Sequence, residues 1–237
     1  MHDPVVFLPG LMCDARVFAP QINAFCRDHV VISAPLVGHE RLEDIAIDLL
    51  PQLPAKFALV GHSLGGNVAM EIARRAPERV SRLALIGTQA MSETPQSSAA
   101  FEPLLVGAKA GRFQDVLREL MLPDYLAQGP NRVAVLNQFL QMATDLGPDV
   151  FQQQVRVLQR RMDQQSVLRR LKCPVLIACG AEDSLTPAKR HQVMADLIPY
   201  SQFQVIEGAG HLPSLEQPEA TLDALQAWLA QPFVLRA

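Results

Sequence analysis

The chain has 237 residues, of which 49% are apolar and 19% are charged, and its formal net charge is −3. This composition excludes a disordered chain, and the mild negative charge gives no electrostatic reason to expect binding to DNA or RNA. No apolar run approaches the ~18 residues of a membrane-spanning helix. The length fits one α/β domain that carries an insertion.

Six short apolar runs are candidate strands. In chain order they cover residues 5–8, 29–33, 57–61, 82–87, 174–179 and 202–206. Continuous apolar runs, rather than alternating ones, are typical of parallel strands covered on both faces. Helical periodicity separates them over residues 15–27, 41–50, 64–76, 188–197 and 217–230. This alternation predicts βαβ units and a doubly wound, mainly parallel α/β sheet.

The alternation breaks once, between residues 88 and 172. Four helices are predicted there, over residues 99–109, 111–121, 131–145 and 149–165. We expect this insertion to lie over the carboxyl edge of the sheet, where ligands bind in open α/β folds. The chain therefore divides into an α/β core of residues 1–89 and 171–237 and a helical lid of residues 90–170. An apolar pocket is expected beneath the lid.

The most informative run is FALVGHSLGG, in which a buried strand leads into Gly61-His62-Ser63-Leu64-Gly65 and then into a helix. This is the G-x-S-x-G pattern in the strand–turn–helix setting of a nucleophile elbow. Gly61 and Gly65 lack side chains that would collide in so sharp a turn. Ser63 is the candidate nucleophile, because free N–H groups at a helix N-terminus favour negative charge there. His62 is expected to pack rather than react.

A serine hydroxyl needs a base to remove its proton. His211 follows the last predicted strand on a glycine-rich loop, and Asp183 follows the fifth strand. The order Ser–Asp–His is the one expected for this arrangement. Glu182 competes with Asp183 as the acid. The other histidines are interpreted as surface or structural residues: His2, His29, His39 and His191.

Four segments resemble the α/β-hydrolase fold superfamily: FLPGL at 7–11, GHSLGG at 61–66, GAEDSLTP at 180–187 and GAGHLPSLEQP at 208–218. The resemblance implies that Ser63 is the nucleophile, His211 the general base and then acid, and Asp183 the residue that orients His211. It also implies an oxyanion hole made by the backbone N–H groups of Leu11 and Leu64. The fuller family fold begins with an antiparallel hairpin, for which the residues before Val5 leave no room. We therefore expect six parallel strands in the spatial order 2-1-3-4-5-6.

Within the superfamily the chain resembles small lidded esterases, enol-lactonases and pimeloyl-carrier-protein methyl esterases. The resemblance implies hydrolysis of a carboxylic ester, lactone or thioester with an apolar acyl group, through an acyl-Ser63 intermediate and with no cofactor or metal. Two alternatives stay open: a small-ligand receptor that retains the triad, and a perhydrolase or carbon–carbon bond hydrolase. Activity should rise with pH through the pKa of histidine, ~6.5, since the base must be neutral.

Residues 156–172 hold six basic residues against one acidic residue. Arg156, Arg160 and Arg161 therefore leave open the binding of an acidic carrier protein. The simpler interpretation is that Arg156 and Arg160 form the solvated face of their helix, opposite its apolar stripe.

The four cysteines, Cys13, Cys26, Cys173 and Cys179, form no C-x-x-C pair. We expect them to be reduced and mostly buried. The first residues show no basic region followed by an apolar stretch of 7–15 residues, so no secretory signal is expected. The absence of a signal favours the cytoplasm.

Overall fold

The computed structural model of the protein describes residues 3–232. Within them, six strands form one sheet in the order β2-β1-β3-β4-β5-β6, and every neighbouring pair is parallel. The strands are β1 (Val5–Leu8), β2 (Val31–Ser33), β3 (Phe57–His62), β4 (Val80–Ile86), β5 (Val175–Gly180) and β6 (Ser201–Ile206). The predicted fold class and strand order are confirmed.

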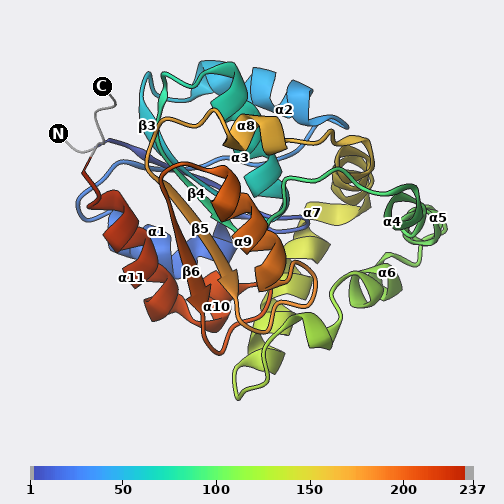
Figure 1. Ribbon diagram of the computed structural model, residues 1–237. Helices are drawn as coiled ribbons and strands as arrows, with labels where there is room; N and C mark the ends of the chain where they lie inside the picture. The colour runs from blue at the N-terminus through green and yellow to red at the C-terminus, as the bar shows by residue number, and fades with distance from the viewer. Residues whose placement is uncertain (1–2, 233–237) are drawn as a thin grey trace.

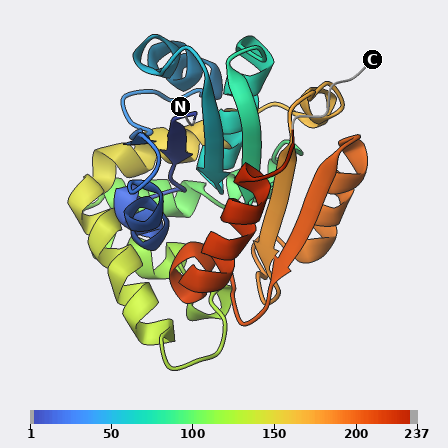
Figure 2. The ribbon, with the colours of Figure 1, turned by 90° about the vertical axis from the view of Figure 1, so that its left-hand side faces the viewer.

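Helices cover both faces of the sheet (Figure 1). One face carries α2 (Leu42–Leu49), α3 (Leu64–Arg75) and α9 (Ala188–Leu197). The other carries η1 (Ala15–Phe18), α1 (Ala19–Phe25), α10 (Pro213–Glu216) and α11 (Pro218–Leu229), and Figure 2 looks onto this face. Every residue of β1, β3, β4 and β5 is buried. Burial from both sides explains why these strands are continuous apolar runs.

The edge strand β2 is shorter than predicted. Residues 29–33 were expected to form it, but the strand covers only Val31–Ser33. The side chain of Val30 is 63% exposed, although its carbonyl still accepts the Val5 N–H. The sequence alone therefore does not distinguish an exposed apolar residue at a sheet edge from a buried strand residue.

Between β4 and β5 the chain forms only helices and loops. These elements are α4 (Pro95–Ala99), α5 (Glu102–Lys109), α6 (Phe113–Leu120), η3 (Pro123–Tyr125), α7 (Arg132–Arg160) and α8 (Gln165–Leu168). Most of them lie beyond the carboxyl ends of the strands (Figure 1). None of the helices within residues 3–232 combines the length and the apolar character that crossing a membrane requires.

The helix α7 corrects two details of the prediction. Two separate helices were expected over residues 131–145 and 149–165, but they form one kinked helix around Gly147 and Pro148. Gly147 has φ 82°, a conformation that glycine adopts at little cost. The helix ends at Arg160, so Met162, which lies within the predicted range 149–165, is outside the helix and is 69% exposed. The chain leaves the helix at Arg161, whose guanidinium is buried against Glu93.

Two buried glutamines attach the inserted helices to the sheet. Gln154 in α7 accepts the Met12 N–H at 2.8 Å and donates to the Leu36 carbonyl at 2.9 Å. Gln164 donates to the carbonyl of Asn67 at 2.9 Å and accepts from the Asn67 side chain at 3.2 Å. Because buried polar groups without partners are costly, these bonds fix where the helices sit over the sheet.

Candidate active site

The turn between β3 and α3 holds Ser63 in a strained conformation, with φ 51° and ψ −117°. A non-glycine residue with positive φ is uncommon and usually marks a constrained site. The turn also packs directly against β1. A Cβ atom on Gly65 would lie 2.1 Å from the carbonyl oxygen of Leu8, and one on Gly61 would lie 2.5 Å from the carbonyl oxygen of Gly65. Both positions of the motif therefore need glycine.

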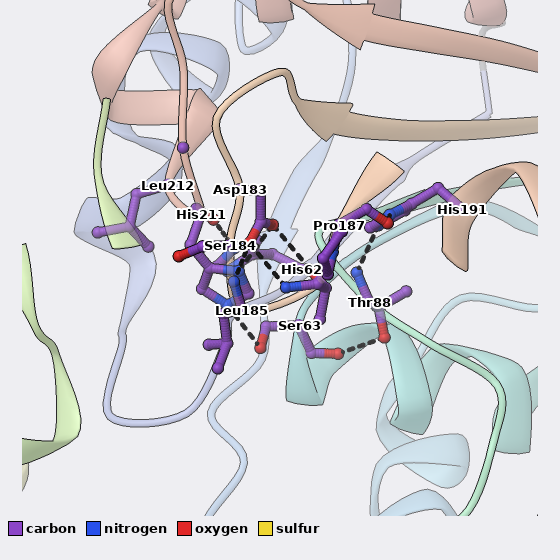
Figure 3. A network of polar contacts seen from close by, with 12 residues as sticks. His62, Ser63, Thr88, Asp183, Ser184, Leu185, Pro187, His191, His211 and Leu212 are labelled. Carbon is purple, nitrogen blue, oxygen red and sulfur yellow. Dashed lines mark hydrogen bonds and ion pairs between the residues drawn. The ribbon is translucent and has the colours of Figure 1, made fainter. Parts of the chain in front are cut away.

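Three side chains predicted from separate parts of the sequence meet at the sheet edge (Figure 3). His211 Nε2 lies 3.1 Å from Ser63 Oγ, and His211 Nδ1 lies 2.9 Å from Asp183 Oδ2. His211 and Asp183 are 3% and 4% exposed. The imidazole thus bridges a hydroxyl and a carboxylate, which is the geometry of a serine nucleophile, its base and an orienting acid.

Asp183 is held by four donors. Its oxygens accept the backbone N–H groups of Leu185 and Thr186, the Thr186 hydroxyl and the His211 imidazole. Burial acts to raise the pKa of Asp183, but His211 and the Thr186 hydrogen bonds outweigh it and lower the pKa to about 2. Asp183 is therefore a carboxylate at neutral pH. Glu182, the competing acid, is exposed, and its Oε2 accepts the Gln128 N–H.

Two further imidazoles are buried beside this group. His62 Nε2 donates to the carbonyl oxygen of His211 at 2.8 Å, and burial followed by the neighbouring His211 lowers the pKa of His62 to about 3. His191 Nε2 accepts the Thr88 N–H at 3.1 Å, and burial lowers the pKa of His191 to about 4. Both rings are neutral at pH 7. The structure thus gives them packing and hydrogen-bonding roles, as the sequence suggested.

The remaining histidines lie elsewhere. His29 Nδ1 is 3.1 Å from the Asp3 carbonyl oxygen, and His39 Nε2 is 2.5 Å from a carboxylate oxygen of Asp48. His2 lies outside the described residues.

The two amides expected to form an oxyanion hole are available. Among residues 3–232, neither the Leu11 N–H nor the Leu64 N–H donates to a protein acceptor. Leu64 is the first residue of α3, where helical N–H groups have no partner within the helix. The neighbouring Met12 N–H, in contrast, donates a hydrogen bond to the side chain of Gln154. Leu11 and Leu64 both line the cavity that contains Ser63.

That cavity has a volume of about 400 Å³ and lies between the sheet edge and the inserted helices. Its apolar lining comes mostly from the inserted helices and includes Phe101, Leu104, Leu120, Met121, Tyr125, Phe139 and Leu158. A polar part of the wall contains Glu93, Arg161 and Arg190. Apolar walls with a few placed polar groups are typical of small-molecule sites.

Each arginine of the predicted basic cluster contacts a glutamate. The pairs are Arg156–Glu102 at 3.0 Å, Arg160–Glu40 at 2.7 Å and Arg161–Glu93 at 2.6 Å. Arg156 and Arg160 lie on the outside of α7, whereas Arg161 is buried in the cavity wall. The three residues therefore do not form one exposed patch of unpaired charge.

The cysteines are free thiols. Cys13 and Cys179 are buried, Cys173 is half-buried and Cys26 is exposed. Burial raises the pKa of Cys179 to about 12, so this thiol is not a nucleophile at neutral pH. Within residues 3–232, no three or more His, Cys, Asp or Glu side chains gather in a way that could hold a metal ion.

Three supporting residues were not assigned roles by the sequence. Thr186 and Glu216 lie inside the segments GAEDSLTP and GAGHLPSLEQP, which resemble the α/β-hydrolase fold, but the resemblance did not indicate what either residue does. Gln154 had no signal, because its partners Met12 and Leu36 are more than a hundred residues away.

Comparison with known proteins agrees with this geometry. Residues 5–224 match the model of the Alpha/beta hydrolase family. The chain is 31% identical to the pimeloyl-[acyl-carrier protein] methyl ester esterase of Aromatoleum aromaticum, over 72% of this chain and 73% of that protein. It is 26% identical to a putative carbamate hydrolase of Pseudomonas savastanoi, over 90% and 88% of the two chains. A malate-bound thermophilic esterase from Thermogutta terrifontis has a similar structure, with a TM-score of 0.87, 27% identity and coverage of 97% and 90%.

Replacing Gly65 with alanine should destabilise the protein by about 2 kcal/mol or more, because the new Cβ would overlap the Leu8 carbonyl. The matched control is Gly129→Ala, since nothing lies within 4 Å of a Cβ at Gly129. Chemical denaturation of both variants checks the prediction. Equal stability of the two would contradict it.

The free energy of unfolding should fall as pH decreases from about 6.5 toward 4. His62 and His191 have pKa values of about 3 and about 4 in the fold, so they gain protons on unfolding in this range. A protonated His191 could not accept the Thr88 N–H. Urea unfolding at pH 7 and pH 5 should show a smaller loss for His191→Gln, which does not titrate, than for the wild type. Losses of the same size would argue against the assignment.

Proposed function

Since this chain belongs to the alpha/beta hydrolase family and is a hydrolase, we propose that it cleaves a carboxylic ester through an acyl intermediate on Ser63. The observation that carries the proposal is the chain of contacts from Ser63 Oγ to His211 and from His211 to Asp183, at 3.1 and 2.9 Å. An apolar cavity opens onto the same hydroxyl. The proposal includes the division into a core of residues 1–89 and 171–237 and a lid of residues 90–170, supported by the helices between β4 and β5.

The first half-reaction acylates Ser63. His211 Nε2 takes the hydroxyl proton as Ser63 Oγ bonds to the ester carbonyl carbon, giving a tetrahedral intermediate. The resulting imidazolium is stabilised by the Asp183 carboxylate. Nε2 then returns the proton to the departing alkoxide as the carbon–oxygen bond breaks, and the alcohol leaves.

In the second half-reaction, water replaces the alcohol. His211 Nε2 takes a proton from water as the oxygen attacks the acyl-Ser63 carbonyl, and the proton passes to Ser63 Oγ as the acyl–enzyme bond breaks. The products are a carboxylic acid and free enzyme. These steps require no cofactor and no metal.

Negative charge on the tetrahedral oxygen would be stabilised by the backbone N–H groups of Leu11 and Leu64. Support comes from the absence of a protein acceptor for either amide within residues 3–232. One such donor contributes about 10²–10³ in rate in a well-studied protease. In the α/β-hydrolase family, His-Gly often precedes the residue that matches Leu11. This chain has Pro9-Gly10 there, a difference that leaves the backbone N–H of Leu11 intact.

The preferred substrate would be a small ester whose acyl group is mainly apolar, since the inserted helices line the cavity with leucine, methionine and phenylalanine. The polar part of the cavity wall favours a substrate with a second property, a negatively charged group. There Arg161 is paired with Glu93, whereas Arg190 contacts the Gln89 side chain at 2.5 Å. Among residues 3–232, Arg190 forms no ion pair within 4.0 Å. A monoester of a dicarboxylic acid would place its free carboxylate against this guanidinium.

A second candidate substrate is an ester carried on an acidic protein. It is favoured by the Aromatoleum relative, which is named an esterase of a pimeloyl-carrier protein. The docking cations on this chain would be Arg156 and Arg160, because the side chain of Arg161, the third arginine of the cluster, is only 2% exposed. Their glutamate partners would have to be displaced, so this candidate has less support than the small ester. We also propose a cytoplasmic location, which the four free thiols support.

Ser63→Ala should lower kcat on p-nitrophenyl esters by at least about 10³-fold, because it removes the nucleophile but leaves the fold. A panel of acyl chain lengths on the wild type would locate the preferred acyl group. The matched control is Ser97→Ala, a serine of the same cavity wall that lies on α4. One burst of p-nitrophenol followed by negligible turnover would instead favour a ligand receptor, and undiminished turnover by Ser63→Ala would refute the proposal.

Arg190→Gln should lower kcat/KM for monomethyl adipate by about tenfold, a fold-change typical of a lost charge-assisted hydrogen bond. Hydrolysis of methyl hexanoate, which has no second carboxylate, should change little. The control Lys189→Gln removes a neighbouring exposed cation that does not line the cavity. Equal effects of Arg190→Gln on both esters would rule out carboxylate recognition by this residue.

The carrier-protein candidate makes a different prediction. Charge reversal of Arg156 and Arg160 should slow hydrolysis of a carrier-linked ester several-fold at low salt and leave a small neutral ester unaffected. Added salt should produce the same contrast in the wild type. Identical responses of the two substrates would exclude docking through these arginines.

A further inference from the structure

Residues 124–128, which we call the connector, include the end of η3 and the start of the loop to α7. They lie against the loops that carry Asp183 and His211. The backbone N–H of His211 donates to the carbonyl oxygen of Tyr125 at 2.7 Å. Leu126 and Ala127 are buried at this contact, with 2% and 4% exposure. The inserted segment therefore contacts His211, the proposed base, through a hydrogen bond to the His211 backbone.

A single carboxylate strengthens this contact. Glu216, which is 8% exposed, accepts the Ala127 N–H at 2.7 Å and the Gly210 N–H at 2.9 Å through Oε2. Its Oε1 accepts the Leu212 N–H at 2.8 Å. Two of these donors flank His211 and the third belongs to the connector. Because both oxygens of this one side chain accept backbone N–H groups, Glu216 ties the connector to both neighbours of the base.

The connector also holds the acid loop. Gln128 N–H donates to Glu182 Oε2 at 3.1 Å, and Ser184 Oγ donates to the Asp124 carbonyl oxygen at 3.0 Å. Glu182 and Ser184 are the neighbours of Asp183 in the chain. The connector thus bonds to the residue on each side of the acid, whereas for the base it bonds to His211 itself and is linked to Gly210 and Leu212 through Glu216.

The connector is closely packed against the loop that carries His211. A Cβ atom on Gly210 would lie 2.3 Å from the carbonyl oxygen of Tyr125 and 2.7 Å from Leu126 Cα. The Glu182 N–H also donates to the Ala209 carbonyl at 2.9 Å, which joins the acid and base loops directly. The connector therefore cannot move far without moving the loops that carry His211 and Asp183.

We propose that the connector couples the position of the lid to the geometry of the triad, and that Glu216 is the positioning residue that transmits this coupling to His211. The inference rests on the proposed function, because it assigns a role relative to the Ser63–His211–Asp183 group. Misplacement of a reacting group by about 1 Å can cost about 10²-fold in rate. A carboxylate that fixes both neighbours of the base can therefore affect turnover without touching the substrate.

The test compares Glu216→Gln with Glu219→Gln on a short p-nitrophenyl ester. Glutamine has nearly the same shape, but its NH₂ group would face N–H donors that now bond to a carboxylate oxygen. We expect kcat to fall about tenfold or more, KM to change less than twofold, and the acid limb of the pH–rate profile to shift. Hydrogen exchange of the Ala127, Gly210 and Leu212 amides should quicken. Glu219, exposed in the first turn of α11, should be neutral in every assay.

A double variant guards against loss of folding in Glu216→Gln. Glu182→Ala with Ser184→Ala removes the two connector bonds of the acid loop at exposed side chains. It should lower kcat several-fold without changing the melting temperature. Wild-type kcat and pH profile in the folded Glu216→Gln, or in the double variant if the former does not fold, would overturn the coupling. Inactivity of Ser63→Ala beside such a result would leave the proposed function standing, whereas activity of Ser63→Ala would overturn both.

Discussion

The contact between β1 and the first turn of α3 is the constraint on which the rest of the site depends. The Leu8 carbonyl approaches Gly65 so closely that no Cβ atom fits between them. This approach forces the chain through Ser63 with positive φ and directs the hydroxyl out of the sheet edge. It also brings the Leu11 and Leu64 N–H groups, one from each side of the contact, to the same cavity. The position of the Ser63 hydroxyl and the two amides is thus set by one backbone contact.

Burial gives three neighbouring imidazoles different roles. His62 and His191 are kept neutral, because each is desolvated and neither contacts a carboxylate directly. His211 alone bonds to Asp183, whose four donors keep it ionised. The site therefore pairs one imidazole with a fixed negative charge, while the other two serve as hydrogen-bonding elements. Since all three rings are buried, this division follows from the contact between His211 and Asp183.

The sequence predicts the parts of this site that are local. The glycine spacing around Ser63 and the loop positions of Asp183 and His211 each follow from a run of neighbouring residues, and the structure brings those side chains together. The strand order, in contrast, follows from the resemblance to the α/β-hydrolase fold. Contacts between distant segments could not be predicted in this way. The burial of Arg161 depends on Glu93, which is 68 residues away, and the predicted helix extended to residue 165, beyond the observed end at Arg160. Glu216 likewise has a visible motif, but its three donors belong to a folded arrangement of two loops.

The inserted helices are part of the site rather than only a cover over it. Through Gln154 they accept the Met12 N–H, whereas the adjacent Leu11 N–H has no protein acceptor among residues 3–232. Through Gln164 they bond to Asn67, one turn after Ser63 in α3. Through Tyr125 they bond to the backbone of His211. One insertion therefore contacts the loop that carries Leu11, the helix that follows Ser63 and the loop that carries His211, while its apolar side chains line the cavity. A substitution that reshapes the cavity also acts on these three contacts, so acyl preference and turnover should change together when this segment changes.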